Sequence, residues 1–491
     1  MLGRRAARLR PPPRLPPCRR GAASFASLRL RPPLLAALDD MGLAEPTEVQ
    51  EAAVPAILGG RDVLIASETG SGKTLGYLLP VVQLLKEQEE KGGRATRLQR
   101  PRAVVVVPSR EVGRQVLRSV KALSHHAKLA SASLCNQPTA ARRAAAVTSR
   151  PIDVLVSTPG RLLDLLQQGP PAQQRGRGRG GGRQGKAEPT LFLSDVRFLV
   201  FDEADVLFDD EFGPTLLPML RRLLRARESR GRPLQCVLAG ASWPGGEPER
   251  LGRRDGQRRQ RPGKRSPLLH GLLRGELRDA VRAESSGLHR LPDNLELSFR
   301  LVPPQQKPAA LLDTLRHVAP AARREAGPSP TPPSVMVFAN TSRAAVFVTA
   351  LLREEAEHDG LDWSVSALHG SMTPADREHE FERFHAPAEE AGLRVLVCTD
   401  VGSRGLDIEA VEHVVLFDCP KNPVDFLHRV GRTARAGAAG RATCLYQKSQ
   451  DGEVVRALKE AYRRKLPVRG LVGWDHSHRE GQGEEAARAR A

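Results

Sequence analysis

Short runs of apolar, often β-branched residues recur along the chain in two series. Each run is nearly continuous rather than alternating, which is typical of strands that are buried on both faces of a parallel sheet. The first series occupies residues 62–66, 103–107, 153–156, 196–201 and 235–239. The second series occupies residues 334–338, 364–368, 394–398, 413–417 and 441–446.

Stretches of helical character, such as residues 75–91 and 111–124, lie between these runs. Strands that alternate with helices predict a doubly wound α/β unit. We therefore predict one α/β unit over residues 25–245 and a second one over residues 297–465.

Three regions have a composition that does not fit a packed core. Residues 173–186 contain repeated Arg-Gly pairs, residues 245–290 are rich in Arg, Gly and Gln, and the end of the chain mixes charge with alanine. Such segments are predicted to be disordered or peripheral. The predicted parts outside the two units are a basic arm over residues 1–24, a basic irregular linker over 246–296 and a tail over 466–491.

The chain of 491 residues has a net charge of +20 and a pI of about 10.5. This charge predicts a polyanionic partner, and nucleic acid rather than a membrane, because no apolar run is long enough to span one. The alternative is that arginine only keeps the protein soluble. Aromatic residues make up 4% of the chain, which favours contact with a nucleic-acid backbone over base stacking.

The spacing of the cysteines and the composition of the first residues indicate the cellular compartment of the protein. The six cysteines are scattered and form no CxxC pair, which argues against zinc and disulfides and fits a reducing compartment. The first 38 residues contain nine arginines and no acidic side chain. This composition predicts a transit peptide for the mitochondrial matrix. The alternative is a disordered basic arm that binds RNA or directs import into the nucleus or nucleolus.

A glycine-rich loop follows the first predicted strand and leads into a helix. Its glycines allow backbone N–H groups to approach phosphates at a helix N-terminus, while Lys73 adds charge and Thr74 a hydroxyl for Mg²⁺. The alternative is a structural turn. The predicted ATP-binding residues of the loop are Ala66, Ser67, Glu68, Thr69, Gly70, Ser71, Gly72, Lys73 and Thr74.

Two further motifs complete the chemistry that ATP hydrolysis needs. Asp202 and Glu203 follow a strand, so we assign Asp202 to Mg²⁺ and Glu203 to the attacking water rather than to a solvated acidic loop. Arg432 and Arg435 are three residues apart on one predicted helix face. We predict that they are arginine fingers from the second unit, which would make hydrolysis depend on domain closure. The alternative is that they lie on a solvated helix face.

With these motifs in this order, the chain resembles the DEAD-box RNA helicases, a superfamily-2 group with two RecA-like domains, over residues 25–465 apart from the inserts. The resemblance implies an ATP hydrolase that uses Mg²⁺ and binds RNA. Phe25 and residues 42–50 are similar to the Q motif. There, Phe25 would stack on adenine, Gln50 would contact the edge of the base, and Thr47 would also bind ATP. The alternative is that Phe25 is a buried core residue and Gln50 a surface residue.

The resemblance also implies contacts to RNA phosphates and to the ribose of ATP. Residues 108–111 are similar to motif Ia, 158–161 match motif Ib, and 399–407 are close to motif V. Hydroxyls, amides and single arginines suit a grip on the backbone that does not read sequence. Asp407 is expected at the ribose. The expected RNA-binding residues are Pro108, Ser109, Arg110, Thr158, Pro159, Gly160, Arg161, Gly370, Arg377 and Thr399.

The chain departs from the family pattern at two places. Residues 240–242 are Gly-Ala-Ser where motif III is usually Ser-Ala-Thr, and this motif couples hydrolysis to strand separation. The double glycine expected between motifs Ia and Ib is absent around Cys135. The Ser-Glu-Thr-Gly of the loop, the acidic run after Asp205 and the arginine-rich start are similar to mitochondrial members of the family that act in ribosome assembly.

We therefore predict a monomeric ATP-dependent RNA helicase that remodels RNA, with rRNA and ribosomal assembly proteins as expected partners. One alternative is an ATP-gated RNA clamp or assembly scaffold that unwinds weakly or not at all. Another is a DNA-directed motor, because no residue proves contact with a 2′-hydroxyl. A P-loop kinase of metabolism explains neither the second unit nor the charge.

Overall fold

The computed structural model describes residues 24–68, 70–93, 97–137, 139–167, 190–208, 213–228, 234–241, 277, 279–326, 332–386, 392–403, 408, 410–420, 423–434 and 438–468. The chain divides after Leu288 into two compact units. Each unit is described by itself. No helix in the described ranges is long and apolar enough to cross a membrane.

A parallel sheet of seven strands, in the order β3-β4-β2-β5-β6-β1-β7, forms the centre of the first unit. Its strands are β1 (Val63–Ala66), β2 (Ala103–Val106), β3 (Ser131–Ser133), β4 (Val154–Ser157), β5 (Phe198–Phe201), β6 (Gln235–Gly240) and β7 (Val281–Glu284). The connecting helices are η1 (Phe25–Leu28), α1 (Pro32–Asp40), α2 (Glu48–Leu58), α3 (Lys73–Gly92), α4 (Arg110–Ala127), α5 (Ala140–Thr148), α6 (Pro159–Gln167), α7 (Ala204–Leu207) and α8 (Gly213–Glu228).

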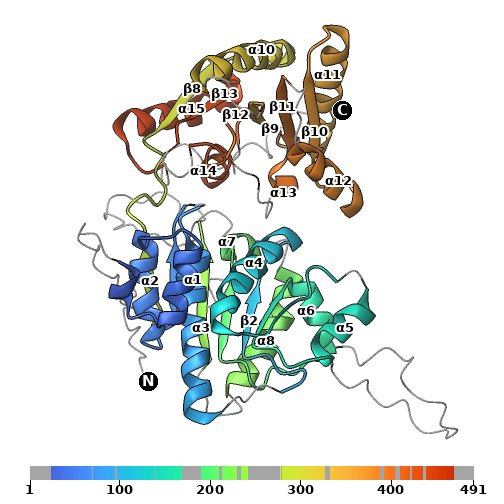
Figure 1. Ribbon diagram of the computed structural model, residues 1–491. Helices are drawn as coiled ribbons and strands as arrows, with labels where there is room; N and C mark the ends of the chain where they lie inside the picture. The colour runs from blue at the N-terminus through green and yellow to red at the C-terminus, as the bar shows by residue number, and fades with distance from the viewer. Residues whose placement is uncertain are drawn as a thin grey trace, which may run out of the picture. The chain divides into compact units, whose positions relative to one another are not determined.

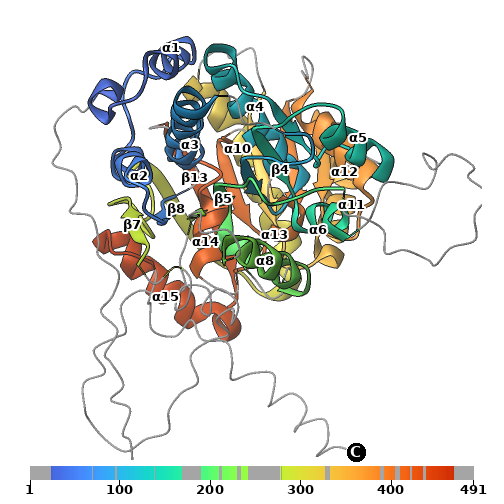
Figure 2. The ribbon, with the colours of Figure 1, turned by 90° about the horizontal axis from the view of Figure 1, so that it is seen from below.

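Alternate residues of each central strand enter two apolar clusters, one on each face of this sheet. In β1, Val63 and Ile65 pack with α1–α4, whereas Leu64 and Ala66 belong to the cluster that contains α5–α8. Both side-chain sets are therefore buried, which explains why the strand sequences are continuously apolar. Figure 2 shows α2 beside β7, at the edge of the sheet that continues from β1.

The second unit is built on a parallel sheet of six strands in the order β10-β11-β9-β12-β13-β8 (Figure 1). Its strands are β8 (Leu295–Leu301), β9 (Ser334–Phe338), β10 (Trp363–Leu368), β11 (Leu393–Cys398), β12 (His413–Leu416) and β13 (Gly440–Tyr446). Its helices are η3 (Pro304–Gln306), α10 (Lys307–Ala326), α11 (Ser342–His358), α12 (Pro374–His385), α13 (Asp400–Ser403), α14 (Pro423–Val430) and α15 (Lys448–Arg464). The α/β prediction is confirmed for both units.

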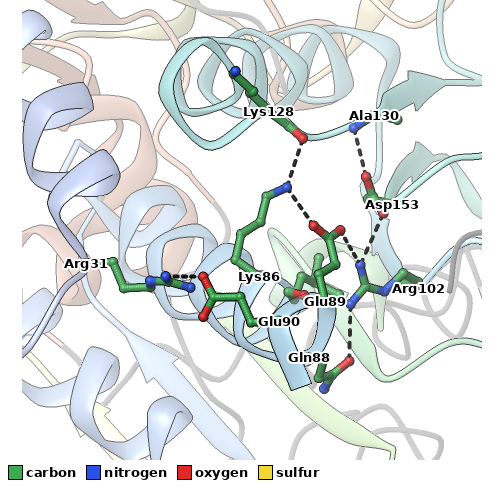
Figure 3. Close-up of polar contacts among 10 residues, drawn as sticks. Arg31, Lys86, Gln88, Glu89, Glu90, Arg102, Lys128, Ala130 and Asp153 are labelled. Atoms are coloured by element: carbon green, nitrogen blue, oxygen red, sulfur yellow. Dashed lines mark hydrogen bonds and ion pairs between the residues drawn. The ribbon is translucent and has the colours of Figure 1, made fainter. Parts of the chain in front are cut away.

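A buried charged network holds α3 against the first sheet, at the edge opposite the phosphate loop (Figure 3). Arg102, 5% exposed, lies just before β2 and contacts Glu89 Oε1 of α3 at 2.7 Å and Asp153 Oδ1 at 3.3 Å. Its Nη2 donates to the Leu85 carbonyl at 2.7 Å, and Asp153 also accepts from the Ala130 amide at 2.9 Å. Arg102, Glu89 and Asp153 are therefore paired with one another. Their contacts fix the far end of α3, the helix that begins at Lys73 of the phosphate loop.

The predicted limits of the two units need correction. Part of the predicted linker forms β7, which pairs with β1 in parallel and extends the first sheet. β8 also begins inside that linker, at Leu295, and Val468 of the predicted tail is fully buried with its amide bonded to the His289 carbonyl at 2.8 Å. Residues 1–23, 168–189, 242–276 and 469–491, which include most of the predicted disordered segments, lie outside the described ranges.

Candidate active site

The phosphate loop connects the end of β1 to the start of α3. Gly70 and Gly72 both have φ of +83°, a conformation that L side chains rarely adopt. The Ser71 hydroxyl donates to the Glu68 carbonyl at 2.8 Å and closes the turn. Thr69, a predicted ligand, lies outside the described residues. The loop therefore has the backbone that a phosphate cradle requires.

Lys73 is the charged group at the centre of this loop. Its Nζ donates to the main-chain carbonyls of Ser67 and Glu68 at 2.6 and 2.5 Å. Burial lowers the pKa of the Lys73 ammonium, while the nearby carboxylates of Asp202 and Asp205 oppose that change. A half-buried ammonium that donates to two loop carbonyls fits a site for a phosphate oxygen, which would neutralise this charge.

Two predicted ATP-binding residues of the Q motif, Thr47 just before α2 and Gln50 within it, contact the loop. The Thr47 hydroxyl donates to the Ser71 carbonyl at 2.8 Å, and Gln50 Nε2 donates to the Gly72 carbonyl at 3.0 Å. A Cβ added at Gly72 would lie 2.3 Å from Gln50 Nε2, so only glycine permits this approach. Phe25 is 4% exposed within the apolar cluster of α1–α4, and packing accounts for its ring in this structure.

The acidic residues lie at the end of β5, on the same sheet edge as the loop. Asp202, 5% exposed, accepts from the Tyr77 hydroxyl at 2.8 Å and from the Glu203 amide at 3.0 Å. Burial raises the pKa of the Asp202 carboxyl, and the Tyr77 bond and Lys73 charge counteract it. Thr74 is the second residue of α3. Hydroxyl and carboxylate oxygens are suitable Mg²⁺ ligands, so Thr74 and Asp202 fit the predicted metal site.

Glu203 has a strained backbone at the point where α7 begins. Its φ and ψ of 49° and 48° lie in the left-handed region, which is uncommon for residues other than glycine. Such strain is found where the surrounding structure fixes a side chain for function. The left-handed backbone of Glu203 is therefore compatible with its predicted role as the group that activates water.

The altered motif III links the phosphate loop to the acidic residues through its backbone. The Ala241 amide donates to Asp205 Oδ2 at 3.1 Å, and the Ser67 amide donates to the Gly240 carbonyl at 3.2 Å. A Cβ at Gly240 would lie 3.0 Å from Asp205 Oδ1. The third residue of the motif, Ser242, is outside the described ranges.

Comparisons with known proteins place this loop, its acidic partners and the second sheet in one family. The family model of the DEAD/DEAH box helicases matches residues 47–251, and the model of the helicase conserved C-terminal domain matches residues 326–437. The ATP-dependent RNA helicase dbp8 of Emericella nidulans is 32% identical over 90% of this chain and 72% of that protein. The chain belongs to the DEAD-box ATP-dependent RNA helicases.

Further relatives and a solved structure show how far the likeness extends. DEAD-box ATP-dependent RNA helicase 39 of Arabidopsis thaliana is 33% identical over 91% of this chain. The chain spans 62% of that protein and 43–50% of two fungal relatives. The structure of S. cerevisiae Dbp5 bound to RNA and ADP BeF3 has a TM-score of 0.63 at 22% identity, and covers 89% of this chain and 93% of that chain. This last likeness shows the fold alone, that of tandem RecA-like domains.

The RNA contacts that the DEAD-box resemblance implies in the first unit lie at the ends of β2 and β4. Ser109 accepts from the Val112 amide at 3.2 Å and caps α4, which Arg110 begins. Arg161 of α6 directs its guanidinium to the carbonyls of Leu134 and Cys135. Arg161 thus fixes the turn that replaces the double glycine. Pro108 and Thr158 lie in the two strand-to-helix connections, and Pro159 and Gly160 are the first residues of α6.

The expected RNA contacts of the second unit follow β10 and β11. Arg377 Nη2 donates to the His369 carbonyl, next to Gly370, at 3.4 Å. The Thr399 hydroxyl accepts from the Gly402 amide at 3.2 Å. The structure therefore brings Gly370 and Arg377 together. Asp407, expected at the ribose, is outside the described residues.

Arg429 is an important residue that the sequence prediction omitted. Its side chain is 2% exposed and forms a two-point ion pair with Asp400, with Nε–Oδ1 and Nη2–Oδ2 distances of 2.8 and 2.7 Å. It also donates to the Asp418 carbonyl at 3.0 Å and to Asn340 Oδ1 at 2.7 Å. Burial opposes its charge, yet the Asp400 carboxylate raises the pKa of the guanidinium. Arg429 thus joins three strand ends of the second unit.

The two predicted arginine fingers follow this residue. Arg432 is half-buried after the end of α14, and its carbonyl accepts from the Val411 amide at 3.1 Å. Arg435 lies outside the described residues. A sequence signal for Arg429 does exist, because it is three residues after Phe426 and adjacent to Val430, both fully buried in α14.

Proposed function

We propose that this protein is an ATP-dependent RNA helicase that unwinds short duplexes or remodels RNA–protein complexes. The observation that supports this proposal most strongly is the pair of opposite charges at one sheet edge, the half-buried Lys73 on the phosphate loop and the buried Asp202 after β5. The chain spans 62% and 50% of two relatives whose names describe ATP-dependent RNA helicases. ATP and RNA are therefore the proposed ligands.

In this proposal, Lys73 and the amides of residues 70–74 bind the phosphates, while Thr74 and Asp202 hold Mg²⁺. The metal supplies charge neutralisation to the phosphates when it is bound. Glu203 accepts a proton from the attacking water. Arg432 and Arg435 stabilise negative charge on the transferred phosphoryl group.

RNA is proposed to bind through its phosphates, because the expected contacts are hydroxyls, amides and arginines. Such contacts do not read sequence. The net charge of +20 adds a non-specific attraction that falls steeply with salt. We infer import into the mitochondrial matrix from the arginine-rich first 38 residues, and a role in ribosome assembly from the similarity to mitochondrial members of the family. Persistence of a tagged variant lacking residues 1–23 in mitochondria would remove the transit-peptide assignment.

The proposed chemistry is tested with Glu203→Gln. We expect kcat for RNA-stimulated ATP hydrolysis to fall by about 100-fold or more, the usual contribution of a general base, with the Kd for MgATP unchanged. Glu354→Gln, which neutralises an exposed carboxylate on α11, is the control and should keep wild-type turnover. Multiple turnover by Glu203→Gln at the wild-type rate would contradict the assignment.

A second candidate is an ATP-gated RNA clamp, which the Gly-Ala-Ser sequence of motif III favours. Displacement of a labelled strand from a short RNA duplex separates the two. A helicase displaces the strand in step with ATP use, whereas a clamp hydrolyses ATP and retains RNA without displacement. Single-stranded DNA of equal length, used in place of RNA, tests the DNA-directed alternative through the stimulation of ATPase activity.

A further inference from the structure

The segment that follows β7 contacts the phosphate loop, although it lies between the two ranges that match the helicase family, 47–251 and 326–437. β7 pairs with β1 so that Glu284 is opposite Ala66, and the Ser285 amide donates to the Ala66 carbonyl at 3.1 Å. The chain therefore passes the start of the phosphate loop just before it enters the second unit at His289.

Ser285 binds the carboxylate of Glu68, which is part of the phosphate loop. The Ser285 hydroxyl donates to Glu68 Oε2 at 2.7 Å, and the Ser67 hydroxyl donates to the same oxygen at 3.1 Å. A Cβ added at Gly287 would lie 3.5 Å from both carboxylate oxygens. Ser285 is 9% exposed and Ser67 is fully buried, so both donors are held in place by their surroundings.

The position of this carboxylate matters because Glu68 is also a backbone element of the cradle. Its carbonyl accepts from Lys73 Nζ at 2.5 Å and from the Ser71 hydroxyl at 2.8 Å. A triphosphate in the cradle would bring several negative charges close to a residue that already carries one. Like charges repel, even at a residue as exposed to solvent as Glu68, where water screens the repulsion in part. Donors that hold the carboxylate on the β7 side therefore favour nucleotide binding.

We propose that Ser285 is a positioning residue for the nucleotide site, whose hydroxyl holds the Glu68 carboxylate away from the phosphates and so sets the affinity for ATP. This inference rests on the proposed ATP-dependent function. It assigns a role to the segment after β7, which lies outside both ranges that match the helicase family. Its ligand is the triphosphate of MgATP.

The neighbouring Ser286 provides a matched control. Its amide and hydroxyl donate to Glu48 Oε2 at 3.0 and 2.8 Å, at the start of α2. It thus fastens the same segment through the same chemistry to a carboxylate outside the phosphate loop. Removing its hydroxyl tests attachment of the segment without releasing Glu68.

The experiment measures the Kd of the full chain for MgATP by equilibrium titration in five variants and the wild type. We expect Ser285→Ala to raise Kd by roughly threefold to tenfold, the usual net worth of one hydrogen bond, and to raise KM with little change in kcat. Ser285→Thr keeps the hydroxyl and should restore the wild-type Kd. Ser286→Ala should leave Kd within about twofold of the wild type.

The deciding measurement is the effect of Ser285→Ala when Glu68 is already alanine. Because no carboxylate then remains to be held, the Kd of Glu68→Ala and of Glu68→Ala/Ser285→Ala should be equal. An equal loss of affinity in both backgrounds would show that Ser285 acts only through the packing of β7 and would overturn the proposal. So would an unchanged Kd for Ser285→Ala. Absence of MgATP binding by the wild type would instead refute the proposed function.

Discussion

Removing the Arg429 guanidinium should destabilise the second unit. The side chain is 2% exposed and makes two bonds to Asp400 and one each to Asp418 and Asn340. Arg429→Met keeps much of the volume but leaves the Asp400 carboxylate without its ion-pair partner. Breaking one side of a buried ion pair typically costs about 3–5 kcal/mol, so we expect a loss of that order in the free energy of unfolding.

The assay needs a signal that belongs to the second unit. Of the three tryptophans, Trp363 lies in β10, so the background Trp243→Phe/Trp474→Phe makes urea unfolding followed by fluorescence a report on this sheet. The double variant Arg429→Met/Asp400→Leu removes both charges and should recover stability, with a coupling energy of about 1–3 kcal/mol.

Arg432→Ala is the matched control from the same motif. It should change the unfolding free energy by less than about 1 kcal/mol, because Arg432 is only half-buried, while it lowers ATP turnover. The reasoning is refuted if Arg429→Met loses less than about 1 kcal/mol, or if the two single changes at Arg429 and Asp400 are additive. Either result would mean that the buried contacts of Arg429 do not hold the strand ends together.

Two further predictions concern single positions. Gly72→Ala should cost about 1–3 kcal/mol more unfolding free energy than Gly70→Ala, because the two glycines share a φ of +83° but only a Cβ at Gly72 meets Gln50 Nε2, at 2.3 Å; equal losses in urea unfolding would contradict this. Burial lowers the pKa of His413 from 6.5 to about 4, so the unfolded chain binds a proton that the folded chain does not. Stability should therefore fall by up to about 3 kcal/mol as pH drops from 6.5 toward 4, and His413→Gln should flatten this slope in urea titrations at several pH values.

The central strands could be predicted from sequence because their burial on both faces leaves a continuous apolar run. β9 was predicted with its exact bounds, Ser334–Phe338. β7 was missed for the opposite reason. It lies at the sheet edge, only Val281 and Ala283 are buried, and Arg282 and Glu284 alternate with them in an arginine-rich region. Such a strand is defined by its pairing with β1, which no local pattern records.

The same distinction applies to the site. The phosphate loop is contiguous in sequence, so phosphate binding could be predicted from its glycines and Lys73. The contacts of Arg429 reach residues 29 and 89 positions away, and Ser285 lies 217 positions from Glu68. A motif shows that Arg429 is present but cannot show that its side chain is turned inward. That assignment requires the packing of α14 against the strand ends.

Motif III shows how a change of side chain can leave a structural link in place. The sequence places Gly240 where the family usually has serine, which weakens the case for coupling if the hydroxyl carries it. In this structure, however, the link is made by main-chain atoms. Ser67 N–H donates to the Gly240 carbonyl, and Ala241 N–H donates to Asp205.

Backbone groups remain after any substitution that keeps the strand, so β6 still joins the phosphate loop to the acidic motif. The absence of a Cβ at Gly240 also relieves a contact that would lie 3.0 Å from Asp205 Oδ1. Loss of the serine therefore removes one polar group while leaving the connection through which the loop and Asp205 can influence each other.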